Sequence, residues 1–305
     1  MGIVVALALA ASLFYGASDF LGAFTARRLT VLKTSTMVYL AATIVATVVL
    51  FLLNWEYSDQ ALWAGVIAGA LATVGMVTFY AALAIGPMSL LAPLIALIQT
   101  AIPVVVAATT GQSLSPMAWV AVGLALIATT LISVPARTES GAPALERITA
   151  RGGLLALASG VTLGLSVVSL DTAPAASGVF PAFLDLAVGL VLLLPLLAVR
   201  RFRTSDDWLN GTKAAPASTS IAPPAPAGVR TWVLSALGGV LLGVGNILLV
   251  LALHSGNLAV VAVLVSLYPL ATVVLAWFVL KERLSIIQFL GVALAITAAV
   301  LLGLS

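Results

Sequence analysis

Residues 75–97, GMVTFYAALAIGPMSLLAPLIAL, align without a gap with residues 245–267, GNILLVLALHSGNLAVVAVLVSL. Alanine and leucine matches are expected by chance between apolar segments, whereas aligned glycines and a shared Leu-Ser pair are not. Such positions coincide at one constant offset: Gly75 with Gly245, Gly86 with Gly256, Leu114 with Leu284 and Ser115 with Ser285. Self-similarity at a constant offset indicates an internal repeat. The sequence therefore predicts two related halves.

The composition indicates an integral membrane protein. Hydrophobic residues make up 62% of the 305 residues and charged residues only 8%, whereas a soluble domain carries about 25% charged residues. A spanning helix needs about 20 mostly apolar residues. Ten such runs are present: 2–26, 34–53, 61–85, 87–110, 116–134, 152–172, 179–199, 231–253, 258–280 and 285–304. We therefore expect an all-α membrane protein with ten transmembrane helices.

The repeat divides these helices into two sets of five. The first half covers residues 1–150 and the second half residues 151–305. Because five is odd, the second half enters the membrane from the opposite side, which predicts two inverted five-helix repeats, an architecture typical of secondary transporters. The Pro/Ala/Ser-rich tract 214–228 is typical of a disordered cytoplasmic segment.

The basic residues predict the orientation. All 13 Lys and Arg residues fall in alternate linkers, and the other linkers and both termini contain none. Under the positive-inside rule the basic side is cytoplasmic, so both termini are expected to be extracytoplasmic. The apolar N-terminus has no basic region before it and is interpreted as a retained first helix. The expected location is a bacterial inner membrane.

The end of each half resembles a known family. Residues 266–302, SLYPLATVVLAWFVLKERLSIIQFLGVALAITAAVLL, and more weakly residues 96–132, are similar to the EamA branch of the drug/metabolite transporter superfamily. Glu282 fills the usual glutamate position of the family, and Gln112 replaces it in the first half. Gly16 belongs to a small-residue motif of the first helix. The resemblance implies secondary transport of small metabolites, and it favours export over uptake.

Two aspartates lie inside expected spans, where an ionised carboxylate is costly. Asp19 shares a small and polar helical face with Tyr15. It either pairs with Arg27 or Arg28 at the cytoplasmic mouth, or faces a cavity and binds a cationic group or a coupling proton. Asp185 is the second proton-coupling candidate. Its alternative is a shallow position that is hydrated from the outer face.

Polar side chains near the midpoints of other spans predict the rest of a substrate site. Gln99 and Tyr268 lie in repeat-related helices, at the depth where transporters of this architecture bind their substrates. Tyr80 and Asn246 lie in helices that carry glycines four residues apart on one face, and both continue that face towards the expected interior. The predicted substrate-binding residues are Tyr15, Asp19, Tyr80, Gln99, Asn246 and Tyr268.

The remaining function classes are narrowed by what the sequence lacks. It has no cysteine and one histidine, which argues against a metal site. No GxxxxGK[ST] motif is present, and no basic run suggests nucleic acid. No cofactor is expected. The predicted function is a secondary active transporter or exporter that moves a small polar or amphipathic metabolite, amino-acid-like or drug-like, by alternating access. An uncoupled facilitator, an intramembrane enzyme and a non-transporting scaffold are the alternatives.

The expected partners are a small-molecule substrate, the lipid bilayer and coupling protons. The chain is expected to be a monomer or a homodimer.

Overall fold

The computed structural model describes residues 2–26, 28–85, 88–112, 114–133, 149–201, 228–271, 274–275 and 285–304. These residues form ten α-helices and one short 3-10 helix, and none of them lies in a strand. Nine of the ten runs expected from the sequence coincide with one α-helix each, and the run 258–280 begins with the shorter helix α9. The all-α fold with ten helices is therefore confirmed. Arg27 and Glu282 fall outside the described residues, as does the tract 214–228 up to residue 227.

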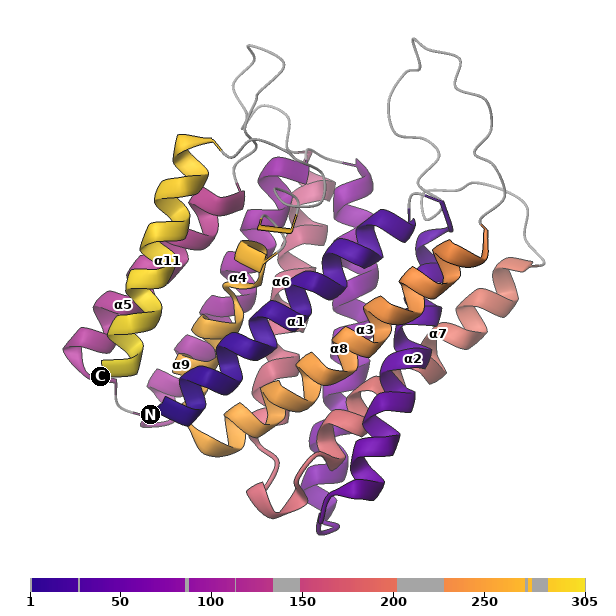
Figure 1. Cartoon of the computed structure of the whole chain (residues 1–305), viewed down its shortest axis with the longest axis horizontal. Helices are drawn as coiled ribbons and strands as arrows, with labels where there is room; N and C mark the ends of the chain where they lie inside the picture. Colours follow the sequence, from indigo (N-terminus) through magenta and orange to yellow (C-terminus); the bar gives the residue numbers. More distant parts are fainter. Residues whose placement is uncertain are drawn as a thin grey trace.

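The helices lie side by side in one bundle (Figure 1). Their bounds are α1 Gly2–Ala26, α2 Val31–Leu52, α3 Asp59–Ile85, α4 Met88–Thr109, α5 Pro116–Ser133, α6 Ala150–Asp171, η2 Ala175–Ser177, α7 Phe180–Arg201, α8 Val229–Ser255, α9 Leu258–Val265 and α11 Ile286–Leu304.

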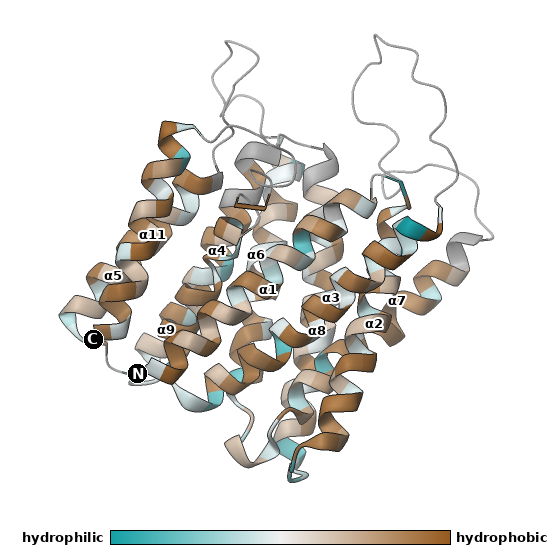
Figure 2. Cartoon of the chain, in the orientation of Figure 1, coloured by the Kyte–Doolittle hydropathy of each residue, from teal (hydrophilic) through white to brown (hydrophobic). Residues whose placement is uncertain are grey.

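Most of these helices have the length and composition of membrane spans. Within the described residues, seven helices are long and apolar enough to cross a membrane, namely α1, α2, α3, α6, α7, α8 and α11. Three shorter apolar helices cover Leu94–Thr109, Pro116–Ile132 and Leu258–Ala271. Figure 2 shows hydrophobic residues along the whole length of the helices. The protein is therefore a multi-pass membrane protein.

Side-chain caps define where several helices begin. The Thr30 side chain accepts a hydrogen bond from the backbone N–H of Lys33 at the start of α2. Thr149 does the same for Gly152 at the start of α6. Asn257 accepts from the N–H of Ala259 at the start of α9. These caps satisfy backbone donors that have no partner within the helix.

Glycines allow the helices to approach one another closely. A Cβ atom at Gly239 of α8 would collide with the backbone of Val38 in α2, and one at Gly69 of α3 would collide with the backbone of Asp185 in α7. A Cβ atom at Gly164 of α6 would lie 2.8 Å from the backbone oxygen of Gln99 in α4. Small residues at such contacts are the usual means by which membrane helices pack. The glycine stripes seen in the sequence thus form the inner contacts of the bundle.

The helix contacts form matching sets. Helix α1 packs on α8 and α3 packs on α6, while α8 also packs on α2 and α3 also packs on α7. Helices α2 and α7, α4 and α9, and α5 and α11 pack on each other directly. The pair α5 and α11 lies at one side of the bundle, and both chain termini lie at the same end (Figure 1).

Helix α9 departs from the continuous span expected over 258–280. It ends at Val265, the backbone turns at Ser266 and Leu267, and helical residues resume at 268–271. Pro269 has no N–H with which to bond the carbonyl group of Val265, so the helix is interrupted at this point. The Ser266 hydroxyl donates to the carbonyl oxygen of Val263 at 2.7 Å. The interruption lies next to Tyr268, one of the predicted site residues.

Candidate functional site

A cavity of about 220 Å³ lies inside the bundle. Its wall is formed by side chains from α1, α2, α3, α4, α6, α7, α8 and α9 and by Tyr268. The polar side chains on this wall are Tyr15, Ser18, Asp19, Thr34, Ser35, Tyr39, Gln99, Ser166, Asp185, Asn246 and Tyr268. The cavity therefore brings together every predicted site residue whose side chain is described. The side chain of Tyr80, the remaining one, lies outside the described residues.

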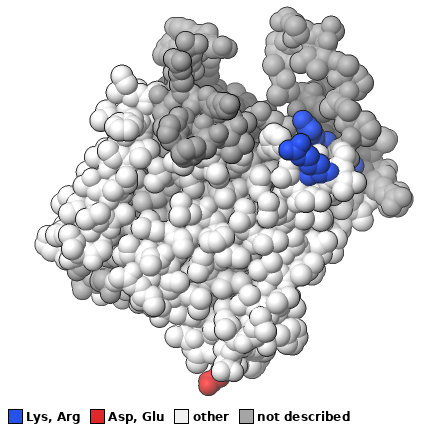
Figure 3. All heavy atoms as spheres, in the orientation of Figure 1, with Lys and Arg blue, Asp and Glu red and all other residues white. Residues whose placement is uncertain are grey.

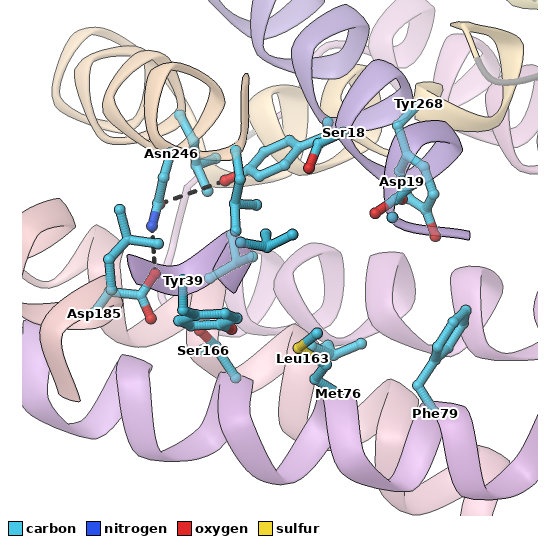
Figure 4. A pocket seen from close by; sticks show the side chains of 18 of the residues that line it. Ser18, Asp19, Tyr39, Met76, Phe79, Leu163, Ser166, Asp185, Asn246 and Tyr268 are labelled. Carbon is cyan, nitrogen blue, oxygen red and sulfur yellow. Dashed lines mark hydrogen bonds between the residues drawn. The ribbon is translucent and has the colours of Figure 1, made fainter. Parts of the chain in front are cut away.

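A chain of hydrogen bonds joins three helices across the cavity wall (Figure 4). The Tyr15 hydroxyl of α1 donates to the Asn246 Oδ1 atom of α8 at 3.4 Å. The Asn246 Nδ2 group in turn donates to the Asp185 Oδ2 atom of α7. Each donor in this chain faces an acceptor, so the direction of both hydrogen bonds is consistent with an ionised Asp185.

Asp185 is buried at the end of this network. Its side chain is only 7% exposed, and its Oδ1 atom has no hydrogen-bond donor among the described residues. A buried carboxylate oxygen without a donor is energetically unfavourable. The alternative for Asp185, a shallow position hydrated from the outer face, stays a prediction, since burial within the bundle is not a depth in the membrane.

Asp19 lies in a different environment. Its side chain is exposed on the cavity wall and lies near Tyr268, apart from the Asp185–Asn246 pair (Figure 4). Among the described residues, no basic side chain forms an ion pair with Asp19. The guanidinium group of Arg28 instead lies 5.7 Å from the centre of the Phe24 ring. The interpretation of Asp19 as an anchor paired with Arg28 therefore has no support, and Arg27 falls outside the described residues.

The sequence reasoning missed the contribution of α2. Tyr39, Thr34 and Ser35 all line the cavity, and Ser166 adds a hydroxyl group from α6. A signal was present in the polar run Thr34–Ser35–Thr36 within an otherwise apolar helix. Tyr39 carried no comparable signal, because a single tyrosine in a span is commonly interfacial.

Linkers and helix ends contact one another at the end of the bundle that holds the chain termini (Figure 1). The Gln60 side chain donates to the carbonyl oxygen of Thr172 at 2.7 Å. Gln112 Oε1 accepts from the backbone N–H of Leu258, at the first turn of α9, at 3.0 Å. The rings of Trp55 and Phe180 are stacked with their centroids 4.7 Å apart. These contacts tie the loops after α2, α4 and α6 to the start of α3, α7 and α9.

Comparison with known proteins identifies the family. A profile of the EamA-like transporter family matches residues 150–304. The chain belongs to the EamA-like transporter family. This confirms the resemblance inferred from the motif at 266–302, and the family is one of membrane transporters of small substrates. The EamA-like chain is thus a multi-pass protein of the lipid bilayer.

Other similarities to the EamA-like chain are more limited. An uncharacterized protein of Methanocaldococcus jannaschii is 38% identical over 69 residues, which are 23% of this chain and 50% of that protein. The chain thus spans about half the length of the curated relative that it matches. One solved crystal structure superimposes with a TM-score of 0.74 at 16% identity, covering 99% of this chain and 96% of the other. At that identity the similarity shows the fold alone.

Proposed function

We propose that this EamA-like protein is a secondary active transporter that moves a small polar or amphipathic metabolite by alternating access. The observation that carries the proposal is the polar cavity, whose wall is shared between residues 1–150 and residues 151–305. The hydrogen-bond chain from Tyr15 through Asn246 to Asp185 joins one helix of the first half to two helices of the second. A substrate in this cavity would contact both halves and respond to their relative movement.

The two halves act as inverted five-helix repeats in this proposal. In the repeat correspondence, α1 to α5 match α6, α7, α8, α9 and α11 in that order. Exchanging each helix for its repeat partner converts the α1–α8 contact into the α6–α3 contact and the α2–α8 contact into the α7–α3 contact. The pairs α2–α7, α4–α9 and α5–α11 map onto themselves. This self-consistency supports an approximate two-fold relation between the halves.

Alternating access requires that one end of the cavity be closed while the other admits substrate. In this proposal, the contacts of Gln60, Gln112 and Trp55 hold closed the end of the bundle at which both chain termini lie. Lys and Arg side chains gather at the opposite end on the face shown in Figure 3. With the basic end cytoplasmic, this arrangement corresponds to a state closed towards the outside, with both termini extracytoplasmic.

Asp19 and Asp185 are the candidates for proton coupling. Both are carboxylic acids on the wall of a cavity within the membrane, where ionisable residues commonly mark ion or proton pathways. Asp185 is the better placed of the two for a proton, since its Oδ1 atom is buried without a donor among the described residues. Asp19 is exposed within the cavity and is better placed for contact with the substrate.

The test is flux into liposomes that contain the purified protein. Radiolabelled candidate metabolites are presented with and without a pH gradient, and empty liposomes provide the baseline. Accumulation above equilibrium with the gradient supports coupled transport. Equilibration without accumulation indicates a facilitator. Complete absence of flux for every compound that binds the protein would contradict transport and favour an enzyme or a scaffold.

A further inference from the structure

We infer that the substrate is an organic monocation, an amine or quaternary ammonium group attached to an aromatic or aliphatic body, and that Asp19 recognises its charge. This inference rests on the proposed transport function and names the substrate class for the same cavity. It narrows the proposed substrates from amino-acid-like or drug-like compounds in general to compounds with a single positive charge.

The first observation is the sign of the charges in the cavity. Asp19 and Asp185 both lie on its wall, whereas none of the described residues that line it is Lys, Arg or His. Charged side chains within a membrane are normally paired with groups of opposite charge. Here the described residues supply two carboxyl groups to one small cavity and no cationic side chain. A cationic substrate would provide the missing partner.

The second observation separates the two carboxyl groups. Asp185 is already engaged on one oxygen by the Asn246 amide, and its buried Oδ1 atom lacks a donor among the described residues. Asp19 is exposed to the cavity, and the nearby basic residue Arg28 is turned towards Phe24 instead. A ligand that enters the cavity can therefore reach Asp19 directly. Asp185 adds negative potential from deeper in the wall.

The third observation concerns the rest of the wall. Tyr15, Tyr39 and Tyr268 supply aromatic rings on the same wall as the carboxyl groups, and Phe79 and Met76 supply apolar surface. Ammonium groups are attracted to the faces of aromatic rings within about 6 Å. The volume of about 220 Å³ is below the roughly 300–1,000 Å³ of pockets for drug-sized ligands. The cavity therefore suits a small amine with one ring or a short alkyl body.

The same set of lining residues disfavours the binding of anions and zwitterions. The carboxylate of an amino acid or the phosphate of a nucleotide would face Asp19 and Asp185 with no Lys, Arg or His from the described lining to neutralise it. Like charges placed together in a low dielectric repel strongly. Selection by charge would thus operate against these compounds as well as in favour of cations.

The test compares the binding of three ligands of similar size and different charge to the purified protein. Phenylethyltrimethylammonium is a permanent cation, 3-phenylpropanoate is an anion and phenylalanine is a zwitterion. We expect isothermal titration calorimetry to detect binding of the cation and at least tenfold weaker binding of the other two. Comparable affinity for the anion or the zwitterion would overturn the inference. This series uses the wild-type protein and needs no variant to fold.

Variants of Asp19 then test whether this residue recognises the charge of the ligand. Asp19→Asn should weaken binding of the permanent cation at least tenfold at every pH between 6 and 8, as an estimate of the loss of one close charge partner. Asp19→Glu should retain most of the affinity. Glu56→Gln makes the same chemical change in the exposed linker between α2 and α3 and should bind as the wild type does. Undiminished binding by a folded Asp19→Asn protein would contradict the role of Asp19.

Flux measurements distinguish the failure of this inference from the failure of the proposed function. Transport of a neutral or zwitterionic compound with no transport of the cation would leave the transporter intact and overturn the substrate class. Tight, Asp19-dependent binding of the cation without any flux would support the cation site and overturn transport.

Discussion

The side-chain amide of Asn246 donates a hydrogen bond to the carboxylate of Asp185, so that α8 and α7 are joined inside the bundle at a position facing the cavity. Both side chains are buried, Asn246 at 3% and Asp185 at 7% exposure. A hydrogen bond to a buried carboxylate contributes more to stability than one between neutral groups, because removing the donor leaves a desolvated charge. This pair is therefore expected to affect both the stability of the bundle and its transport.

Removing the donor should destabilise the protein. We expect Asn246→Ala to lower the free energy of unfolding by about 1.5–3 kcal/mol, measured by denaturant unfolding in detergent. In a double-mutant cycle with Asp185→Asn, the two effects should be less than additive, since both variants disrupt the same contact. Asn54→Ala, an exposed position after α2, serves as the control and should be close to neutral. Full additivity would mean that the two residues do not interact.

Asp185→Asn is expected to abolish proton coupling while the movement of substrate through the protein continues. An asparagine at this position keeps an oxygen that can accept from Asn246, so the local structure should be retained. It cannot exchange a proton. Accumulation of substrate driven by a pH gradient should therefore disappear, while exchange of labelled for unlabelled substrate continues. If the pH gradient still drives accumulation in this variant, Asp185 does not carry the coupling proton.

The glycine contacts between α8 and α2 should not tolerate large side chains. A Cβ atom at Gly239 or Gly243 already meets the backbone of α2, so Gly239→Leu and Gly243→Leu should each destabilise the bundle by about 1–3 kcal/mol or more. Gly123→Leu in α5 provides a matched control, because a Cβ atom there meets nothing within 4 Å. Thermal unfolding in detergent measures the effect. Equal stability of Gly239→Leu and Gly123→Leu would show that the α8–α2 contact does not hold the bundle together.

The closed end of the bundle can be examined by cysteine labelling, since the native chain contains no cysteine. Leu170 lines the cavity and is only 1% exposed, so Leu170→Cys should react slowly with a membrane-impermeant maleimide. Adding Gln112→Ala removes the side-chain acceptor for the Leu258 N–H at the start of α9 and should accelerate labelling several-fold. Thr172→Cys, which is exposed, should react quickly in both backgrounds. Unchanged labelling of residue 170 would show that Gln112 does not help to close this end.

The membrane orientation is open to a direct test. Reporter fusions at either terminus should be active only on the extracytoplasmic side, and a tag inserted between residues 214 and 227 should be cytoplasmic. The reason is the restriction of all 13 Lys and Arg residues to alternate linkers. A cytoplasmic C-terminus would contradict this orientation and would reverse the side to which the closed end faces.

Run length and composition alone determined that this chain is an α-helical membrane protein with ten helices, because an apolar span of about 20 residues is a local property of the sequence. The family motif at 266–302 was equally local and is confirmed by the match over residues 150–304. The six predicted site residues with described side chains, including Asp185, also share one cavity. Polar groups in apolar spans avoid lipid, and this physical rule predicted their inward position.

The partners of these residues were decided only by the tertiary structure. Asp185 and Asn246 are 61 positions apart in the chain, and no local pattern specifies their contact. Tyr39 was missed because α2 is apolar around most of its circumference, so the face that lines the cavity depends on which helices surround it. The proline at 269 was visible in the sequence, but the end of α9 at Val265 and the turn beside Tyr268 appear only once the helix is packed. Hydrophobicity places a residue in the membrane, whereas helix packing determines which side chains it meets.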